Sequence, residues 1–207
     1  MPTDVAGVLL AGGQSRRMGG GDKCLRPLGG EPILGHVIRR AEPQVSALML
    51  SANGDPARFR DYGLPVVADV ILDDSGGSAG PLAGILSGLR WAAASAPACR
   101  WLASFPTDAP FMPRDLVARM AAALEAEGAE MACAASAGRA NPVVGLWPLC
   151  LVDELERAMV EEAMRKIDIW TARYRLTQVE FGADPLDPFF NTNRPEDLEE
   201  AERRLAG

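Results

Sequence analysis

A glycine-rich, basic segment near the start of the chain has the residue types that a phosphate-binding site needs. It runs from Leu10 to Lys23 and contains five glycines, two arginines and a lysine. Glycine lets the backbone approach a ligand closely, and arginine or lysine places positive charge against phosphate oxygens. The segment follows the short apolar run 5–10, which is typical of a buried strand. A strand that leads into such a loop predicts a site for a nucleoside triphosphate.

The spacing within this loop excludes two common nucleotide-binding motifs. A P-loop needs G-x-x-x-x-G-K-[ST], whereas Lys23 follows Asp22 and precedes Cys24. The loop also lacks the G-x-G-x-x-G pattern of dinucleotide-binding enzymes. The sequence therefore argues against kinases, ordinary NTPases and most NAD-dependent enzymes.

A stiff turn carries the candidate metal ligand, Asp108. The turn follows the apolar run 101–105, and Pro106 and Pro110 flank the aspartate. Mg²⁺ often takes only one or two protein carboxylates and completes its shell with water and phosphate oxygens. The alternative role for Asp108 is to cap the next helix. A phosphate-binding loop in the same chain favours the metal.

Three other groups of residues are candidates for ligand contacts. Segment 78–84 leads into a helix whose first amides and dipole suit an anion or a base edge. Asn191 and Asn193 precede a predicted helix, where they would hold a ligand or cap the helix. Basic side chains that could anchor an anionic second substrate are Arg139, Arg165 and Lys166. Charges on a helix are usually only solvated, which is the alternative for the last group.

Predicted strands and helices alternate along the chain. Strands are predicted at 5–10, 45–50, 65–68, 101–105, 131–135, 142–146 and 176–181. Helices are predicted to begin at Pro32, Pro81, Pro113 and Pro195, and 149–174 is predicted to be mostly helical. This alternation predicts an α/β fold, a single domain over 1–207 with a mainly parallel sheet covered by helices on both faces. Ligands bind at the carboxyl ends of such strands, so the loops after Leu10, Leu50, Ala68 and Phe105 should form the site.

Composition narrows the class of protein. The 207 residues are 48% apolar, enough for a substantial core, and the net charge of −7 argues against bulk nucleic-acid binding. No apolar run reaches the roughly 18 residues of a membrane helix, and the first residues lack a targeting signal. The four cysteines form no C-x-x-C pair, which is typical of reduced thiols. We expect a cytoplasmic protein that binds neither nucleic acid nor membrane.

In order along the chain, these motifs resemble the molybdenum cofactor guanylyltransferases, a family of nucleotidyltransferases. The family motif L-A-G-G-x-S-x-R-M-G followed by D-K is similar to residues 10–23. It is followed by G-P-L-A-G at 80–84, P-x-D-x-P at 106–110 and N-x-N-x-P-E-D-L at 191–198. The first motif is specific, and the others gain weight from their order over nearly the whole chain.

The resemblance implies a Rossmann-like fold and a reaction that transfers GMP from GTP to the terminal phosphate of molybdenum-molybdopterin. It implies Mg²⁺ on Asp108, with Mn²⁺ as an alternative metal, and catalytic roles for Lys23, Arg17 and Asp108. Nucleotide contacts are implied for Leu10, Ala11, Gly12, Gly13, Lys23, Asn53, Asp69 and Asp108. Acceptor contacts are implied near Asn141, where relatives often have His or Gln before the proline, and are expected at Arg139, Arg165, Lys166, Asn191 and Asn193. Molybdenum-insertion proteins, recipient molybdoenzymes and their chaperones are candidate partners.

Three alternative functions stay open on the sequence. One is a cytidylyltransferase that acts on the same pterin. Two features resemble the guanylyl branch of the family instead: the second glycine of the first motif and segment 80–84. Another is a sugar- or alditol-phosphate nucleotidyltransferase, which is usually longer. A non-catalytic nucleotide-binding module would keep the glycines but lose Lys23 or Asp108, and both are present.

Overall fold

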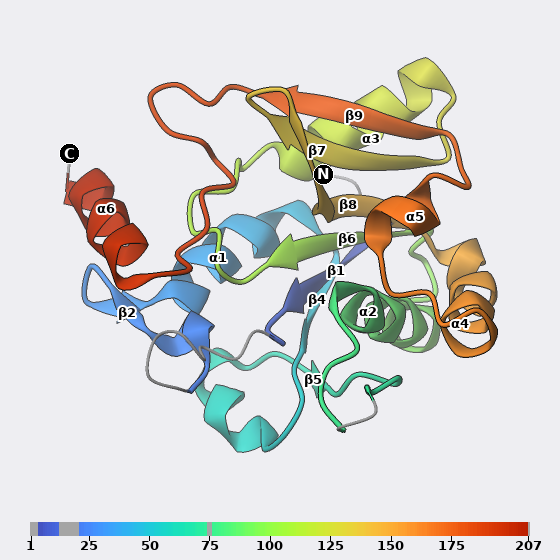
Figure 1. The fold of residues 1–207 in the computed structure, drawn as a ribbon, viewed down its shortest axis with the longest axis horizontal. Coiled ribbons are helices and arrows are strands. Elements are labelled where there is room, and N and C mark those ends of the chain that lie inside the picture. The colour runs from blue at the N-terminus through green and yellow to red at the C-terminus, as the bar shows by residue number, and fades with distance from the viewer. Residues whose placement is uncertain (1–3, 13–20, 74–75, 207) are drawn as a thin grey trace.

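One seven-stranded sheet forms the centre of the molecule. The structure is a computed structural model that describes residues 4–12, 21–73 and 76–206. The strand order is β5-β4-β1-β6-β8-β7-β9 (Figure 1). The strands are β1 (Val5–Leu10), β4 (Ala47–Ser51), β5 (Val66–Val67), β6 (Trp101–Pro106), β7 (Met131–Ser136), β8 (Arg139–Pro148) and β9 (Leu176–Phe181). Each lies at or within a few residues of a predicted strand.

Among these strands, β8 alone runs against the others. It pairs antiparallel with both β6 and β7, whereas every other pairing in this sheet is parallel. The reversal follows from the turn between β7 and β8, because a two-residue hairpin turn can join only antiparallel strands. Ala137 and Gly138 form that turn, with φ of 49° and 71°. The predicted mainly parallel sheet is confirmed, with one reversed strand.

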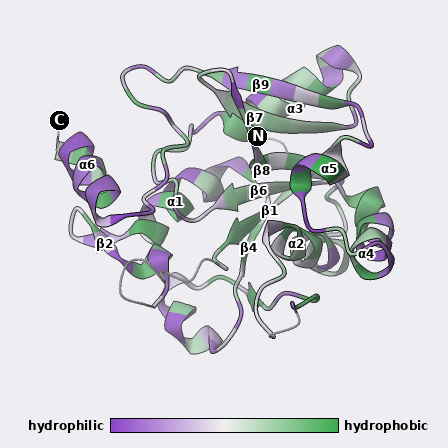
Figure 2. Ribbon diagram, viewed as in Figure 1, coloured by the Kyte–Doolittle hydropathy of each residue, from purple (hydrophilic) through white to green (hydrophobic). Residues whose placement is uncertain are grey.

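Helices cover both faces of the sheet, as the sequence predicts. Because side chains alternate along a strand, Val5 and Leu9 of β1 face one core while Ala6 and Val8 face the other. The first core contains α1 (Ile33–Ala41) and α3 (Leu116–Glu127), and the second contains α2 (Pro81–Ser95), α4 (Val152–Glu161) and α5 (Ile167–Thr171). Figure 2 shows hydrophobic residues along the central strands, whereas α6 (Pro195–Ala206) is largely hydrophilic. This arrangement confirms the α/β fold class.

Short elements complete the fold around the first loop. A 3-10 helix at Lys23–Leu25 leads into a small hairpin of β2 (Pro27–Leu28) and β3 (Glu31–Pro32), which the sequence did not predict. A second 3-10 helix at Pro56–Tyr62 follows β4. None of the helices in the described residues is long and apolar enough to cross a membrane.

Close packing of α2 on the sheet depends on a glycine. A Cβ built at Gly88 would lie 2.9 Å from Leu102 Cδ2 and 2.9 Å from Val8 Cβ. Both neighbours are fully buried, so neither can move aside without disturbing the sheet. The helix therefore rests on β1 and β6 at a distance that only glycine allows.

We expect Gly88→Ala to destabilise the protein. Overpacking in a core costs about 1–3 kcal/mol, which for a chain of this size lowers Tm by several degrees. Gly35→Ala in α1 is the matched control, because its Cβ would meet Glu31 Cδ only at 3.6 Å. Thermal unfolding of both variants measures the difference. A Gly88→Ala protein as stable as Gly35→Ala would contradict this packing.

Candidate active site

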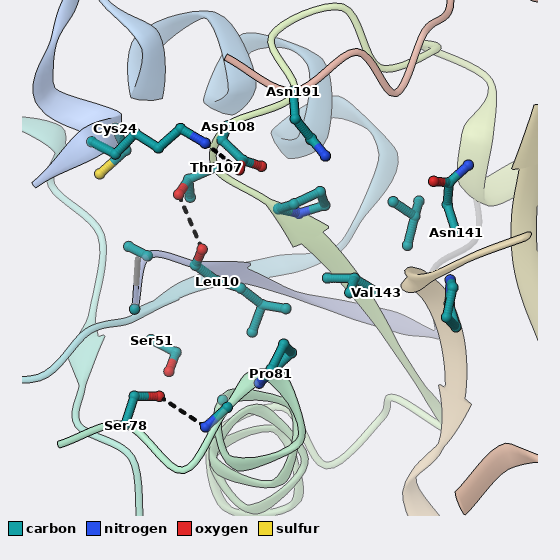
Figure 3. A pocket seen from close by; sticks show the side chains of 18 of the residues that line it. Leu10, Cys24, Ser51, Ser78, Pro81, Thr107, Asp108, Asn141, Val143 and Asn191 are labelled. Carbon is teal, nitrogen blue, oxygen red and sulfur yellow. Dashed lines mark hydrogen bonds and ion pairs between the residues drawn. The ribbon is translucent and has the colours of Figure 1, made fainter. Parts of the chain in front are cut away.

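A pocket of about 490 Å³ opens at the carboxyl edge of the parallel strands. This volume is in the range of small-molecule sites. Its lining comes from the ends of β1, β4 and β6, the segment after β5, the start of α2, the first half of β8 and the segment before α6. Figure 3 shows Asp108 and Asn141 on opposite sides of the pocket, with Asn191 pointing into it. The loops that the sequence singled out therefore meet in one place.

Lys23 and Asp108 form the charged centre of this pocket. Lys23 Nζ lies 2.6 Å from Asp108 Oδ2, and the side chains are 11% and 27% exposed. Lys23 begins the 3-10 helix after the glycine-rich segment, and Asp108 lies two residues beyond the end of β6. The two residues are 85 positions apart in sequence. A cation and a carboxylate side by side at a strand edge can bind phosphate and a phosphate-bound metal, respectively.

The ends of β1 and β6 bring these two residues together. Leu10 pairs with Pro106 in the sheet register, so both strands end level. Thr107 Oγ1 donates a hydrogen bond of 3.0 Å to the Leu10 carbonyl. This bond holds the two loops together at the point where they leave the sheet.

The segment before α6 contacts both members of the pair. Asn193 Oδ1 accepts a hydrogen bond from Lys23 Nζ. Thr192 donates from its backbone N–H, at 3.0 Å, and from Oγ1, at 3.2 Å, to the carbonyl of Asp108. The two asparagines were predicted from the sequence, whereas Thr192 was not, because a buried threonine between polar neighbours gives no local signal.

Asp69 lies at another side of the pocket within a hydrogen-bonded cluster. Its carboxylate accepts from Ser51 Oγ at 2.9 Å, Asn53 Nδ2 at 3.0 Å and Ser78 Oγ at 2.8 Å. Asn53 Oδ1 in turn accepts from the Asp69 backbone N–H at 2.8 Å. The resemblance implied Asp69 and Asn53 as nucleotide contacts, and Ser78 begins the candidate segment 78–84, whereas Ser51 was not among the predicted site residues. These three hydrogen bonds fix the orientation of the Asp69 carboxylate.

Arg58 is a further residue near the site that was not predicted from the sequence. Its guanidinium donates from Nε to Asp22 Oδ2 at 2.5 Å and from Nη2 to the Asn53 carbonyl at 2.6 Å. These bonds join the end of the glycine-rich segment to the loop after β4. Arg58 and Asp22 are 36 residues apart, so no local pattern connects them.

The thiol next to Lys23 does not titrate near neutral pH. Cys24 is 2% exposed. Burial, helped by the negative charge of Asp22, raises the pKa of the Cys24 thiol to about 11. A protonated buried thiol is a poor nucleophile, so Cys24 contributes packing beneath the pocket.

The predicted site residues fall into three groups by position. The pocket is lined by Leu10, Ala11, Gly12, Lys23, Asp69, Asp108, Asn141 and Asn191, and Asn53 and Asn193 contact this lining. Gly13 and Arg17 lie outside the described residues. The lining does not include Arg139, Arg165 or Lys166 among the residues that the structure describes.

The basic acceptor candidates have other surroundings. Arg165 donates to the carbonyls of Met159 and Met164, at 2.7 and 2.8 Å, and so closes the end of α4. Lys166 is exposed at the start of α5, and Arg139 is exposed at the start of β8. The structure therefore does not bring these three side chains into the pocket.

The donor set suits a metal that arrives with a nucleotide. No group of three or more His, Cys, Asp or Glu side chains is close enough to hold a metal within the described ranges. Asp108 offers one partly exposed carboxylate at the pocket wall. Mg²⁺ fits such a site because phosphate oxygens and water complete its octahedral shell, whereas a structural zinc site would need more protein ligands.

Comparison with known proteins agrees with the geometry. The MobA-like NTP transferase domain matches residues 7–174. A molybdenum cofactor guanylyltransferase from Bradyrhizobium sp. (strain ORS 278) is 54% identical over 204 residues, which cover 99% of this chain and 94% of the relative. A protein of the same name from Rhodopseudomonas palustris (strain HaA2) is 53% identical, covering 94% and 89% of the two chains.

Solved structures show the same fold. Molybdopterin-guanine dinucleotide biosynthesis protein A from Archaeoglobus fulgidus superposes with a TM-score of 0.74 at 22% identity, over 97% of this chain and 98% of the other. The two relatives, which match 99% and 94% of this chain, confirm the family resemblance found in the motifs. The chain belongs to the molybdenum cofactor guanylyltransferases, within the MobA-like NTP transferase family.

Proposed function

We propose that this chain transfers GMP from GTP to the terminal phosphate of molybdenum-molybdopterin and releases pyrophosphate. Its relatives carry the name of this guanylyl transfer. The observation on this chain that carries the proposal is the Lys23–Asp108 pair, 2.6 Å apart at the edge of a pocket large enough for a nucleotide. Two further statements stay predictions from the sequence: that residues 1–207 form a single nucleotidyltransferase domain, and that the protein is cytoplasmic.

The charges in the pocket orient the nucleotide. The Asp69 carboxylate repels phosphate and can accept a hydrogen bond from a base N–H or a ribose hydroxyl. The Lys23 ammonium attracts the negatively charged triphosphate. The nucleoside therefore lies toward Asp69, along Leu10, Ala11 and Gly12, with the phosphates toward Lys23. The sequence alone adds Gly13 and Arg17 to the residues proposed to bind the nucleotide.

Asp108 is the proposed ligand for Mg²⁺, or for Mn²⁺ in its place. When bound, the ion supplies positive charge to the phosphate oxygens and to the leaving pyrophosphate. Lys23 neutralises the charge that develops toward the β-phosphate. Because Asp108 pairs with Lys23, each side chain also holds the other in place for these tasks.

The reaction needs no general base from this chain. A phosphate monoester has its second pKa near 6, so the acceptor is already an ionised nucleophile at neutral pH, and catalysis consists of positioning and charge neutralisation. The single histidine fits this view. His36 Nε2 lies 2.9 Å from the Leu28 carbonyl of the small hairpin, outside the described pocket lining.

The acceptor occupies the other half of the pocket. Pro142, Val143 and Phe189 contribute apolar lining to the pocket, and Asn141 and Asn191 contribute amide groups. A flat heterocycle against such a lining, with amides at its polar edge, suits a pterin. We expect molybdenum-insertion proteins to supply the acceptor. We expect recipient molybdoenzymes or their chaperones to take up the product.

We expect Lys23→Met and Asp108→Asn each to reduce guanylyl transfer by about 10²–10³-fold, the usual effect of removing a group that stabilises developing charge. Pyrophosphate release measures the rate, and circular dichroism checks folding. Arg100→Met is a control, because Arg100 pairs with Asp4 on the surface. Turnover near the original level in either variant would remove that residue from the mechanism.

We expect Asp69→Asn to raise the KM for GTP by about tenfold or more, since a hydrogen bond to a charged group contributes roughly 1.5–3 kcal/mol. Its effect on kcat should be smaller, because Asp69 is on the nucleoside side. Asp55→Asn is the matched control, since Asp55 caps the neighbouring 3-10 helix by accepting from Ala57 N–H. An unchanged KM in Asp69→Asn would place the nucleoside elsewhere.

The choice of base has a direct test. The protein is incubated with each of the four NTPs, Mg²⁺ and molybdenum-loaded molybdopterin, and pyrophosphate is measured. We expect release with GTP. Release with CTP and not with GTP would instead identify a cytidylyltransferase.

A further inference from the structure

Thr192 is a fully buried polar residue in an exposed segment. It is 0% exposed, whereas Asn191 and Asn193 on either side are exposed. Buried hydroxyls are found where they satisfy a specific partner. The partner here is the main chain of Asp108, 84 residues earlier.

The turn that carries Asp108 receives hydrogen bonds from outside the turn. Pro106 and Pro110 flank it and have no backbone N–H, so neither can hydrogen-bond a carbonyl within the turn. A carbonyl in such a setting needs a partner from elsewhere in the protein. Thr192 provides two, since its backbone N–H and its Oγ1 both donate to the Asp108 carbonyl, at 3.0 and 3.2 Å.

The segment that holds Thr192 is itself fixed at both ends. Phe189 is 5% exposed and packs edge-on against Phe181 of β9, with ring centres 5.6 Å apart. On the other side, Asp197 Oδ2 accepts from the backbone N–H groups of Asn193 and Arg194, at 2.9 and 2.8 Å. Contacts on both sides of Thr192 therefore hold its segment in place.

We propose that Thr192 is a positioning residue, which fixes the Asp108 main chain so that the Asp108 carboxylate is held ready for the metal and for Lys23. The proposal rests on the proposed function, since that function assigns the metal to Asp108. Thr192 is fully buried and is not among the described residues that line the pocket. Thr192 acts on the carboxylate through the Asp108 main chain. Asn193, the next residue, accepts a hydrogen bond from the Lys23 ammonium, so the same segment contacts both members of the ion pair.

The test compares three variants of the full-length protein. Thr192→Val keeps the side-chain shape and removes the hydroxyl donor, whereas Thr192→Ser keeps the donor. Thr171→Val is the matched control: Thr171 is 3% exposed, and its Oγ1 donates to the Asp168 carbonyl at 3.3 Å in α5. Should Thr192→Val fail to fold, Thr192→Cys replaces it, because a thiol is only a weak donor.

Metal binding is the main readout. Mn²⁺ is titrated calorimetrically into each protein saturated with a non-hydrolysable GTP analogue, and the Mg²⁺ concentration for half-maximal pyrophosphate release is measured in parallel. We expect Thr192→Val to weaken Mn²⁺ binding about three- to tenfold, as for the loss of one hydrogen bond. The half-maximal Mg²⁺ concentration should rise by a similar factor, and Thr192→Ser and Thr171→Val should stay close to the original protein.

Two results would overturn the proposal. One is Mn²⁺ affinity in Thr192→Val equal to that of the original protein. The other is an equal loss in Thr171→Val, which would reduce the effect to general destabilisation. Absence of pyrophosphate release from the unaltered protein would count against the guanylyl transfer itself, while the Mn²⁺ titrations would still decide the role of Thr192.

Discussion

The ion pair between Lys23 and Asp108 depends on one constraint, the level ends of β1 and β6. Leu10 and Pro106 are partners in the sheet, and Thr107 binds the Leu10 carbonyl directly beyond them. Neighbouring parallel strands that end level deliver the chain to the same edge of the sheet. Opposite charges on the loops that follow these strands then meet at 2.6 Å although 85 residues separate them. The position of the proposed nucleotide site therefore follows from strand register as much as from individual side chains.

The reversed strand β8 adds the second half of the pocket. An antiparallel strand begins at the edge where its parallel neighbours end, so the first residues of β8 reach the same opening as the loops after β1 and β6. Asn141 consequently lies across the cavity from Asp108 (Figure 3), and Pro142 and Val143 line the same pocket. A purely parallel sheet would have placed that strand's start at the opposite edge. The tight turn at Ala137 and Gly138 thus brings the start of β8 to the part of the pocket that we propose for the acceptor.

Most of the fold could be predicted because its signals are local. Apolar runs mark the strands, prolines mark helix starts, and Gly128 ends α3 in a left-handed conformation with φ of 59°. The small hairpin of β2 and β3 escaped prediction, since two-residue strands leave no period to detect. At the site, Lys23 and Asp108 were found from charge and turn chemistry. Arg165 was expected to serve an acceptor and instead closes the end of α4.

The sequence by itself determined the α/β class, the family and the loops that bear the charged residues, because each is written in motifs a few residues long. Only the tertiary structure decided the reversed strand, the cluster around Asp69, the Arg58–Asp22 link and the double hydrogen bond from Thr192 to Asp108. Those features join segments far apart in the chain. Their energies depend on distance and direction in space, which no local pattern of residues specifies.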